Sequence, residues 1–579
     1  MSKFILLSFC LLIVNMQAAE KNTPAGLAKQ IEYHLYLADN KAAYQKAKAA
    51  IEKYPHDLAI IKVYIQSMIA CDKEKKAIEH FDYYFAHKKS LLDNLDFLEN
   101  ICWKIIDRGT YSSQYYIRLS SLIAGFLAQD SHSVELMGKM MEDPNAIIRA
   151  MTTSFVAQYK DEMLKRKVID RLEKESVWLV RLELIKAIGR MGIYEKQSFL
   201  KEIIQDDKNT FEEKASAIES LLSLYEKISA EEIIELAKSS KMGFRQFACM
   251  AAVYFKVDGA KAVIYDLIHD INPIVRIEAF NALAVYFREL IPNEKLQIAV
   301  SLGIKDHDPT VSITASWLQL LLDSSKSQEI AKWIYSDDKR HSRLAAAAIA
   351  TSGKQGINLA KEILQKHPDQ YVKANVALGL ISQRQAIDES LAVLFELLDN
   401  KQSLWMWAAT QNPLFTQIAP SEIRHMQQMP QYPETMDLMA QLNVLSVLAI
   451  FNPDGATGYI QKFLSQKQWG VSAIAASTLL KECSLESIDF VETFLNHKEP
   501  NIRIQAALML AMFAKDNRAF KVLQEAYYSV DREKKMIILE AIAQGGTIGT
   551  LDFLIHVLQE PSQTLRIMGA SAIIRAINH

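Results

Sequence analysis

The sequence predicts an all-α protein, an α-solenoid of stacked helical hairpins. A basic residue followed three positions later by a small one returns about every 32 residues through most of the chain. Several of these motifs begin with proline, which favours the first position of a helix. Glycine (19) and proline (14) are scarce in the 579 residues, as in chains that are almost entirely helical. A fixed repeat of this length is typical of stacked helical pairs, because one pair cannot bury its apolar face alone.

Basic anchor residues define the repeat. The arginine anchors are Arg149, Arg181, Arg245, Arg276, Arg343, Arg503 and Arg566, and the lysine anchors are Lys214, Lys373 and Lys535. Ser312 and Ser472 stand in the same phase without the charge. Small residues follow most anchors by one helical turn, at Ala217, Ala248, Ala279, Ala315, Ala346, Ala475, Ala506 and Gly569. A small side chain on this face lets the neighbouring helix approach, so we interpret the anchors as structural.

Helix boundaries show the expected residues. Asn272-Pro273 and Asp308-Pro309 each pair a side chain that caps a helix with a proline that suits the first helical position. Glycines that can end helices stand at Gly189, Gly192, Gly353 and Gly356. A second apolar helix lies between successive anchors, so each repeat is predicted to be a helix–turn–helix unit.

The motif Pro273-Ile274-Val275-Arg276, with spaced alanines and the short repeat period described above, resembles the short repeats of the HEAT family. The resemblance covers residues 141–579. It implies hairpins stacked into a right-handed superhelix whose surface binds proteins or peptides. Members of the family often carry a polar ladder of Asp and Arg between repeats, to which Asp308 and Arg276 could contribute here. The motif specifies architecture and says little about function.

Residues 20–140 follow a different spacing. Ala43 is followed by Ala77, and Ala47 by Phe81, at the same slightly longer interval. This interval resembles that of tetratricopeptide repeats. Generic hairpins that cap the solenoid are the alternative, because terminal repeats are normally atypical.

Residues 1–19 are predicted to be a secretory signal peptide. A weakly positive start is followed by an apolar run from Phe4 to Val14, too short to span a bilayer, and by small residues at Ala18 and Ala19. Lipidation at Cys10 is disfavoured by the bulky Phe9 before it. We therefore expect an exported protein, periplasmic or secreted, with no transmembrane segment in the mature chain. The lack of any Asn-x-Ser/Thr sequon favours a bacterial source.

The charge balance and the motif search exclude several classes of function. Lys and Arg total 66 against 68 for Asp and Glu, so the charge is balanced. The sequence contains no long basic stripe, so we do not expect the protein to bind nucleic acid. No catalytic, phosphate-binding or metal-ligand motif occurs, and we expect no catalytic residue, no metal and no cofactor.

Cys71 and Cys102 are one repeat apart, and the sequence leaves open whether they form a disulfide. Four histidines precede anchors in consecutive units, namely His269, His307, His341 and His367. Stacked helices are about 8–10 Å apart, so these are predicted to be polar turn residues and not a joint metal site.

The irregular segment 403–441 is the predicted partner-binding region. It holds four of the 14 prolines and is rich in Trp and Met. The candidate contact residues are Trp405, Trp407, Phe415, His425 and Tyr432. A loop that projects from a rigid scaffold with exposed aromatic residues suits a protein interface. The alternative is a bent hairpin whose aromatic residues pack in the core.

The function predicted from the sequence is that of an exported, non-catalytic scaffold that binds a protein or peptide. Bilin lyases and their relatives also contain short HEAT-like repeats, so an enzyme-accessory role with a chromophore or other small ligand is one alternative. A passive structural role in the cell envelope is another.

Overall fold

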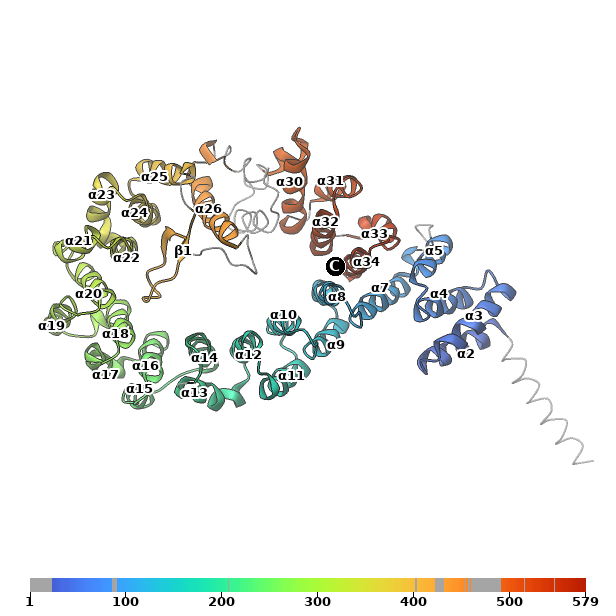
Figure 1. The fold of residues 1–579 in the computed structure, drawn as a ribbon, viewed down its shortest axis with the longest axis horizontal. Coiled ribbons are helices and arrows are strands. Elements are labelled where there is room, and N and C mark those ends of the chain that lie inside the picture. Colours follow the sequence, from blue (N-terminus) through green and yellow to red (C-terminus); the bar gives the residue numbers. More distant parts are fainter. Residues whose placement is uncertain are drawn as a thin grey trace, which may run out of the picture. The chain divides into compact units, whose positions relative to one another are not determined.

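The computed structural model describes residues 23–578, apart from gaps at 86–90, 207, 401–403, 422–431, 453, 457–458, 460–490, 515 and 546. Most of the described chain is helical, which confirms the predicted all-α class (Figure 1). The predicted signal peptide, His425, Ala475 and Cys483 lie outside the described residues. In the described part of the chain, no helix is long and apolar enough to cross a membrane.

The chain divides into two compact units. Unit 1 comprises Met1–Val156, Asp161–Lys167 and Val491–His579, and unit 2 comprises Ala157–Lys160 and Val168–Phe490. Unit 1 therefore combines the expected tetratricopeptide-like region with both the first and the last HEAT-like repeats, and its border does not coincide with residue 140.

Unit 1 consists of helical hairpins from both ends of the sequence. Its helices are α2 (Pro24–Tyr36), α3 (Asn40–Lys53), α4 (Leu58–Ala70), α5 (Glu74–Phe85), α7 (Leu95–Gly109), α8 (Tyr115–Ala128), α9 (Ser131–Met140), α10 (Ala146–Val156), α30 (Pro500–Phe513), α31 (Asn517–Tyr527), α32 (Arg532–Gly545), α33 (Leu551–Val557) and α34 (Gln563–Asn578). The starts of α2 and α4 are separated by the same interval as those of α3 and α5. Ala43, Ala47, Ala77 and Phe81 are all buried, as the repeated spacing requires.

Unit 2 continues the hairpins from α11 (Glu162–Lys174), which the division between the units crosses. The following helices are α12 (Trp178–Met191), α13 (Gln197–Gln205), α14 (Phe211–Leu224), α15 (Ala230–Ala237), α16 (Met242–Tyr254), α17 (Lys261–Asp266), α18 (Pro273–Val285), α19 (Asn293–Gly303), α20 (Pro309–Leu322), α21 (Gln328–Ile334), α22 (Lys339–Ala350), α23 (Ile357–Lys366), α24 (Gln370–Ser382), α25 (Ile387–Asp399) and α26 (Tyr432–Phe451). Short 3₁₀ turns lie at η1 (Tyr194–Lys196), η2 (Asp258–Ala260), η3 (Leu267–His269), η4 (Phe287–Glu289) and η5 (Gly353–Gly356), and in unit 1 at η6 (Phe494–Asn496) and η7 (Ile548–Thr550). The helices that carry the anchors, from α12 to α24, follow one another at the period of the sequence motif, so these hairpins are HEAT-like repeats.

The predicted helix starts form, but two of the glycines predicted to end helices, Gly189 and Gly356, do not end one. Gly356 is the N-cap of α23. The Asn272 side chain caps α18 and that of Asp308 caps α20, each before a proline. Gly192 ends α12 in the left-handed conformation, with a φ of 68°. Gly189, however, lies inside α12, where an added Cβ would stand 2.6 Å from Cα of Ser220. The glycine at position 189 therefore serves close helix packing and not helix termination.

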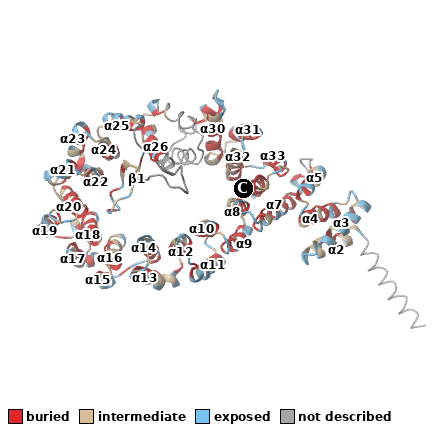
Figure 2. Ribbon diagram, in the orientation of Figure 1, coloured by how far each residue is buried: buried red, intermediate tan, exposed pale blue. Residues whose placement is uncertain are grey.

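The core lies between neighbouring hairpins. Figure 2 shows the buried residues on the faces where helices meet and the exposed residues on the remaining sides. The small residues one turn after the anchors are buried, namely Ala217, Ala248, Ala279, Ala315, Ala346, Ala506 and Gly569. This confirms that the small residues of the repeat motif lie where neighbouring helices pack.

The last helix of the chain packs against the first repeats within unit 1. Helix α34 contacts α7 and α8 as well as its sequence neighbour α32 (Figure 1). The buried Ser571 hydroxyl donates to the carbonyl of Ala124 at 2.6 Å. An added Cβ at Gly109 would stand 2.7 Å from Cδ1 of Ile567, so a larger residue there would force neighbouring side chains to move. Unit 1 is thus a joint between segments from opposite ends of the sequence.

A β-hairpin is the one departure from the all-α prediction in the described chain. Strands β1 (Trp405–Ala408) and β2 (Gln417–Pro420) pair antiparallel, with Trp405 opposite Pro420 and Ala408 opposite Gln417. Both strands lie in the irregular segment 403–441. Prolines and β-favouring aromatic residues explain why this segment does not continue the helical repeat.

Candidate functional site

The structure places the predicted partner-binding residues largely in the interior of unit 2. Trp405 is 1% exposed and Phe415 is 0% exposed, while Trp407 is half-buried. Tyr432 is the first residue of α26, and His425 lies outside the described residues. The prediction that Trp405 and Phe415 are exposed contact residues is therefore wrong, because both side chains are enclosed by the chain itself.

The β-hairpin is attached to the helices of unit 2 by buried polar and aromatic contacts. Asn412, in the hairpin loop, exchanges amide hydrogen bonds with Asn281 of α18 at 3.1 and 2.9 Å. Asn375 of α24 both donates to the carbonyl of Ile418 and accepts from its N–H, at 2.9 and 2.8 Å. Phe415 meets Trp317 of α20 edge-on, with the ring centroids 5.1 Å apart. The segment predicted to bind a partner is thus bound to helices α18, α20 and α24 of the same unit.

The arginine anchors form a polar ladder. The guanidinium of Arg276 binds Asp306 through Nε and Nη2 at 2.8 and 2.7 Å, and its Nη1 donates to the carbonyls of Asp270 and Ile271. Arg245 binds Asp270 in the same way. The partner of Arg276 is therefore Asp306 and not Asp308, whose carboxylate is used to cap α20.

The ladder extends further than the anchors marked in the sequence. Arg118 of α8 binds Asp143 with the same geometry, one repeat before Arg149. At the other end, Arg566 of α34 binds Glu74 of α5 at 3.1 Å. The ladder thus continues across the joint in unit 1, and the anchors that bind a carboxylate serve the stacking of repeats, namely Arg118, Arg181, Arg245, Arg276, Arg343, Lys535 and Arg566.

An open polar groove lies in unit 1 along one face of α7. A cavity of about 660 Å³ is bordered by α2, α4 and α7, including Glu32, Tyr36, Asn100, Asp107 and Tyr111. Tyr36 and Tyr111 are 87% and 77% exposed. Because these aromatic rings stand unburied beside polar side chains, this cavity has the composition of a recognition surface.

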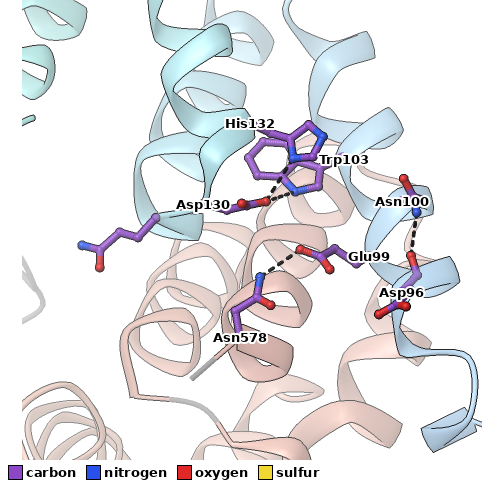
Figure 3. Close-up of a pocket in the computed structure, with 8 residues that line it drawn as sticks. Asp96, Glu99, Asn100, Trp103, Asp130, His132 and Asn578 are labelled. Atoms are coloured by element: carbon purple, nitrogen blue, oxygen red, sulfur yellow. Dashed lines mark hydrogen bonds and ion pairs between the residues drawn. The ribbon is translucent and has the colours of Figure 1, made fainter. Parts of the chain in front are cut away.

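A second cavity, of about 490 Å³, shares the lining residue Asn100 with the first. It lies between α7, the turn before α9 and the end of α34 (Figure 3). The rings of Trp103 and His132 stack at 5.2 Å, and Oδ2 of Asp130 binds both, at 2.9 Å from Nε1 of Trp103 and 3.1 Å from Nδ1 of His132. Asn578 of α34 donates to Glu99. We call the two cavities together the α7 groove.

The α7 groove is acidic at its second cavity. Asp96, Glu99 and Asp130 border that cavity, and its described lining includes no lysine or arginine. Burial would raise the pKa of Asp130, but hydrogen bonds from Ser131, His132 and Trp103 outweigh it and lower that pKa. Asp130 is therefore ionised near neutral pH and favours a positively charged group in the cavity.

Residues along α7 give the groove its length. Asp96, Asn100, Trp103, Asp107 and Tyr111 follow one another at three- and four-residue steps and all border the groove. From Asp96 to Asp107 the helix rises about 17 Å, and Tyr111 lies in the turn that follows its end. An extended peptide of about five residues covers the helical part. The groove therefore has the length and the polarity that an extended segment of another protein needs.

The histidines and cysteines that stand out in the sequence belong to no metal-binding cluster among the described residues. No group of three or more His, Cys, Asp or Glu residues is placed to hold a metal ion among the residues described. His367 is buried and contacts the carbonyl of Ile334, while His269 and His307 are exposed next to turns. Cys71 and Cys102 are free thiols. Burial raises the pKa of the Cys102 thiol, which makes it unreactive.

The sequence contained signals for both missed features. Arg118 stands one repeat before Arg149 and has the small Ser121 three positions later, so it fits the motif. The polar stripe on α7 has helical spacing, but a polar stripe also marks an ordinary solvated face. Only the neighbouring α2, α4 and α34 turn this stripe into a groove.

Comparisons with known proteins find weakly similar solved structures and no family. No family model matches the chain, and no curated protein matches it. Among solved structures, the crystal structure of Kap121p bound to Ste12p is similar over 96% of this chain and 70% of that one, with 11% identity and a TM-score of 0.32. The Kap95:Nup1 complex covers 94% and 78%, with 13% identity and a TM-score of 0.29. These scores are too low to carry an inference about function, and the assignment of the fold rests on the helices themselves.

Proposed function

We propose that the chain is an exported, non-catalytic scaffold that binds an extended segment of another protein in the α7 groove. The observation that carries the proposal is a pair of cavities that both lie along α7 and share the lining residue Asn100. A solenoid presents such a face on rigid elements, so binding costs little ordering of the scaffold.

The chemistry of the groove favours a segment with a basic side chain. The carboxylates of Asp96, Glu99 and Asp130 border one cavity, where a Lys or Arg side chain would be attracted. The exposed rings of Tyr36 and Tyr111 offer apolar contact area at the other cavity. We infer a partner segment that is extended, carries at least one basic residue and has an apolar residue several positions away.

Site-specific photocrosslinking tests the proposal. Tyr111→p-benzoylphenylalanine in the full-length chain, expressed in its native cells, is expected to form an adduct with one defined segment of one protein. Tyr254→p-benzoylphenylalanine is the matched control, because Tyr254 of unit 2 is also exposed, at 66%, and lies outside the groove. Adducts from both positions with the same set of proteins would contradict a specific groove.

Export is a separate part of the proposal, carried by the sequence of residues 1–19. We expect the N-terminus of the mature chain to follow Ala19 and the protein to be found in the envelope or the medium. N-terminal sequencing of the purified native protein measures this. A cytoplasmic protein that retains Met1–Ala19 would overturn the export proposal and leave the proposal for the α7 groove unaffected.

Visible absorbance of the purified protein would instead favour the alternative of a bound chromophore.

A further inference from the structure

The anchor arginines of the ladder share one pattern of hydrogen bonds. In Arg118, Arg245 and Arg276, Nη1 donates to the main-chain carbonyls of the residues five and six positions earlier. The other edge of each guanidinium, formed by Nε and Nη2, donates to both oxygens of one carboxylate. The first edge fixes the guanidinium to the start of its own helix, and the second joins it to the next repeat. We call an anchor together with its carboxylate a rung of the ladder.

The carboxylate of these three rungs accepts from three donors. It belongs to the residue six positions before the next anchor position, as Asp306 does relative to Ser312. Besides the two guanidinium donors, it binds the main-chain N–H two residues later, so Asp306 accepts from the N–H of Asp308 at 2.9 Å. Asp143 and Asp270 accept from the equivalent N–H groups at 2.8 Å each. Each of these rungs is thus a small oxyanion site that the chain fills itself.

Arg503 of α30 has the first edge of this pattern and not the second. Its Nη1 donates to the carbonyls of His497 and Lys498, at 2.8 and 3.1 Å. Its Nε and Nη2 have no acceptor among the described residues, although the side chain is half-buried. Neither atom is among the buried unpaired ones, so both are accessible to solvent. The guanidinium is therefore fixed as in the other rungs, without a carboxylate from the described chain.

The residue at the rung position explains this difference. Lys535 is the next anchor, and six positions before it stands Ser529, whose exposed hydroxyl donates to the carbonyl of Ala526. The main-chain N–H two residues later, that of Asp531, has no acceptor among the described residues. The three donors of a rung are therefore present at Arg503, and a serine replaces the aspartate that they bind elsewhere.

The carboxylate of Asp531 lies in the same turn but has another role. Its Oδ1 accepts from the N–H of Lys534, and its Oδ2 is 3.9 Å from Nζ of that lysine. Nζ of Lys534 also donates to Oδ1 of Asn501, which shows that the starts of α30 and α32 lie side by side. Asp308 stands at the equivalent place, and it likewise caps its helix and takes no part in the rung of Arg276.

An aspartate at this place can nevertheless reach an anchor. Asp369, which corresponds to Asp531, binds Nη2 of Arg343 at 2.8 Å. The side chain of Asp531 is 62% exposed and forms no ion pair with Arg503 in the described chain. Asp531 is therefore the group with which a ligand of Arg503 competes, and its variant belongs in the test.

We propose that Nε and Nη2 of Arg503 and the N–H of Asp531 bind an oxyanion, a carboxylate or phosphate group, at the rung position. A planar guanidinium binds either kind of oxyanion through two parallel hydrogen bonds. Because Nη1 already holds this guanidinium in place, binding orders little of the protein. The neighbouring anchor Lys535 is paired with Glu560 at 2.8 Å, so the charge that attracts the ligand is that of Arg503.

This site goes beyond the proposed function and is separate from the α7 groove. Neither Arg503 nor Asp531 borders a cavity of that groove. A bound oxyanion would connect α30 with α32 as the rung carboxylates connect other repeats, and it would stabilise the C-terminal repeats of unit 1. A free anion and an acidic group on another protein share this chemistry.

Titrations with two simple anions test the proposal. The melting temperature of the full-length chain is measured with inorganic phosphate and, separately, with acetate, each against sodium chloride at equal ionic strength. Isothermal titration calorimetry gives the dissociation constants. We expect at least one anion to raise the melting temperature beyond the chloride reference, and Arg503→Gln to weaken its binding by about tenfold or more. Stabilisation by phosphate alone assigns a phosphate ligand, and stabilisation by acetate alone assigns a carboxylate.

Ser529→Asp is the sharpest variant, because it places a carboxylate at the rung position. It is expected to raise the melting temperature in chloride and to abolish the response to the anion. Arg503→Lys, which keeps the charge and loses the parallel donors, provides a second variant if Arg503→Gln does not fold.

Arg276→Gln is the matched control, because the rung of Arg276 is complete. It should lower the melting temperature in every buffer and leave anion binding unchanged. Asp531→Asn removes the competing carboxylate and should preserve or strengthen the binding. A wild-type chain that responds to neither anion, even if Asp531→Asn does respond, would overturn the site. An anion response that persists unchanged in Arg503→Gln or in Ser529→Asp would also overturn it.

Discussion

The α7 groove of unit 1 and the β-hairpin face of unit 2 use the same helical hairpins in opposite ways. In unit 1, α2, α4 and α7 leave a polar face with exposed tyrosines open to solvent. In unit 2, α18, α20 and α24 are covered by residues 404–421, whose Trp405, Phe415 and Ile418 are buried. Aromatic residues in a loop-like segment therefore indicate a filled face here, while the open face carries polar side chains. The predictions below separate the two faces, from the largest expected effect to the smallest.

Removal of a large hairpin side chain should have the largest effect. Phe415→Ala or Trp405→Ala is expected to destabilise unit 2 by about 3–5 kcal/mol, because each leaves a cavity in the core. Thermal unfolding followed by circular dichroism measures the loss, and hydrogen exchange locates it in the hairpin and α24. Trp178→Ala is the control, since Trp178 is exposed. Wild-type stability in Phe415→Ala would show that the hairpin is not part of the core.

The ladder comes next. Arg276→Ala should cost about 3 kcal/mol, because it leaves the carboxylate of Asp306 largely buried without its partner. Arg343→Ala also leaves a largely buried carboxylate, that of Asp369, without its partner, but it loses one hydrogen bond in place of four, so it should cost less than Arg276→Ala. Parallel denaturant titrations measure both values. Equal losses would remove the distinction between the two anchors.

The joint of unit 1 can be weakened on its own. Gly109→Ala should destabilise unit 1 by about 1–3 kcal/mol, because the added methyl group would clash with Ser121 and Ile567. Hydrogen exchange should rise in α34 and α8. Gly549→Ala offers a control, since the nearest atom to its added Cβ is 3.6 Å away. Unchanged exchange in α34 would contradict the packing of the last helix on the first repeats.

A buried acid should give a modest pH effect. Burial raises the pKa of Glu278 above its ordinary value of 4.5, despite hydrogen bonds from Gln246 and Asn281. The unfolded chain loses this proton at lower pH than the folded chain, so stability falls as the pH rises above 4.5. Glu278→Gln should therefore raise the melting temperature at pH 7 by about 1–3 °C and have little effect at pH 4. A larger gain at pH 4 than at pH 7 would reverse the sign of the argument.

The repeat architecture is predictable because it depends on local periodicity. The positions of Arg276, Ala279 and Pro273 define a helix, its packing face and its start, and all three behave as expected. The hairpin could not be predicted, since its stability comes from Asn281 and Asn375, which are 131 and 43 residues from their partners. The α7 groove depends likewise on α34, whose Asn578 lies 479 residues from Glu99. Contacts at such distances leave no periodic trace in a single sequence.

The central claim is that the open face of α7, and not the covered face of unit 2, binds the partner. The segment identified by crosslinking is prepared as a synthetic peptide, and fluorescence anisotropy measures its affinity for the full-length mature chain. The account predicts that Tyr36→Ala with Tyr111→Ala weakens binding by about tenfold or more, with the melting temperature nearly unchanged, while Tyr254→Ala has no effect. Equal affinity for the wild type and the groove double variant would contradict the account.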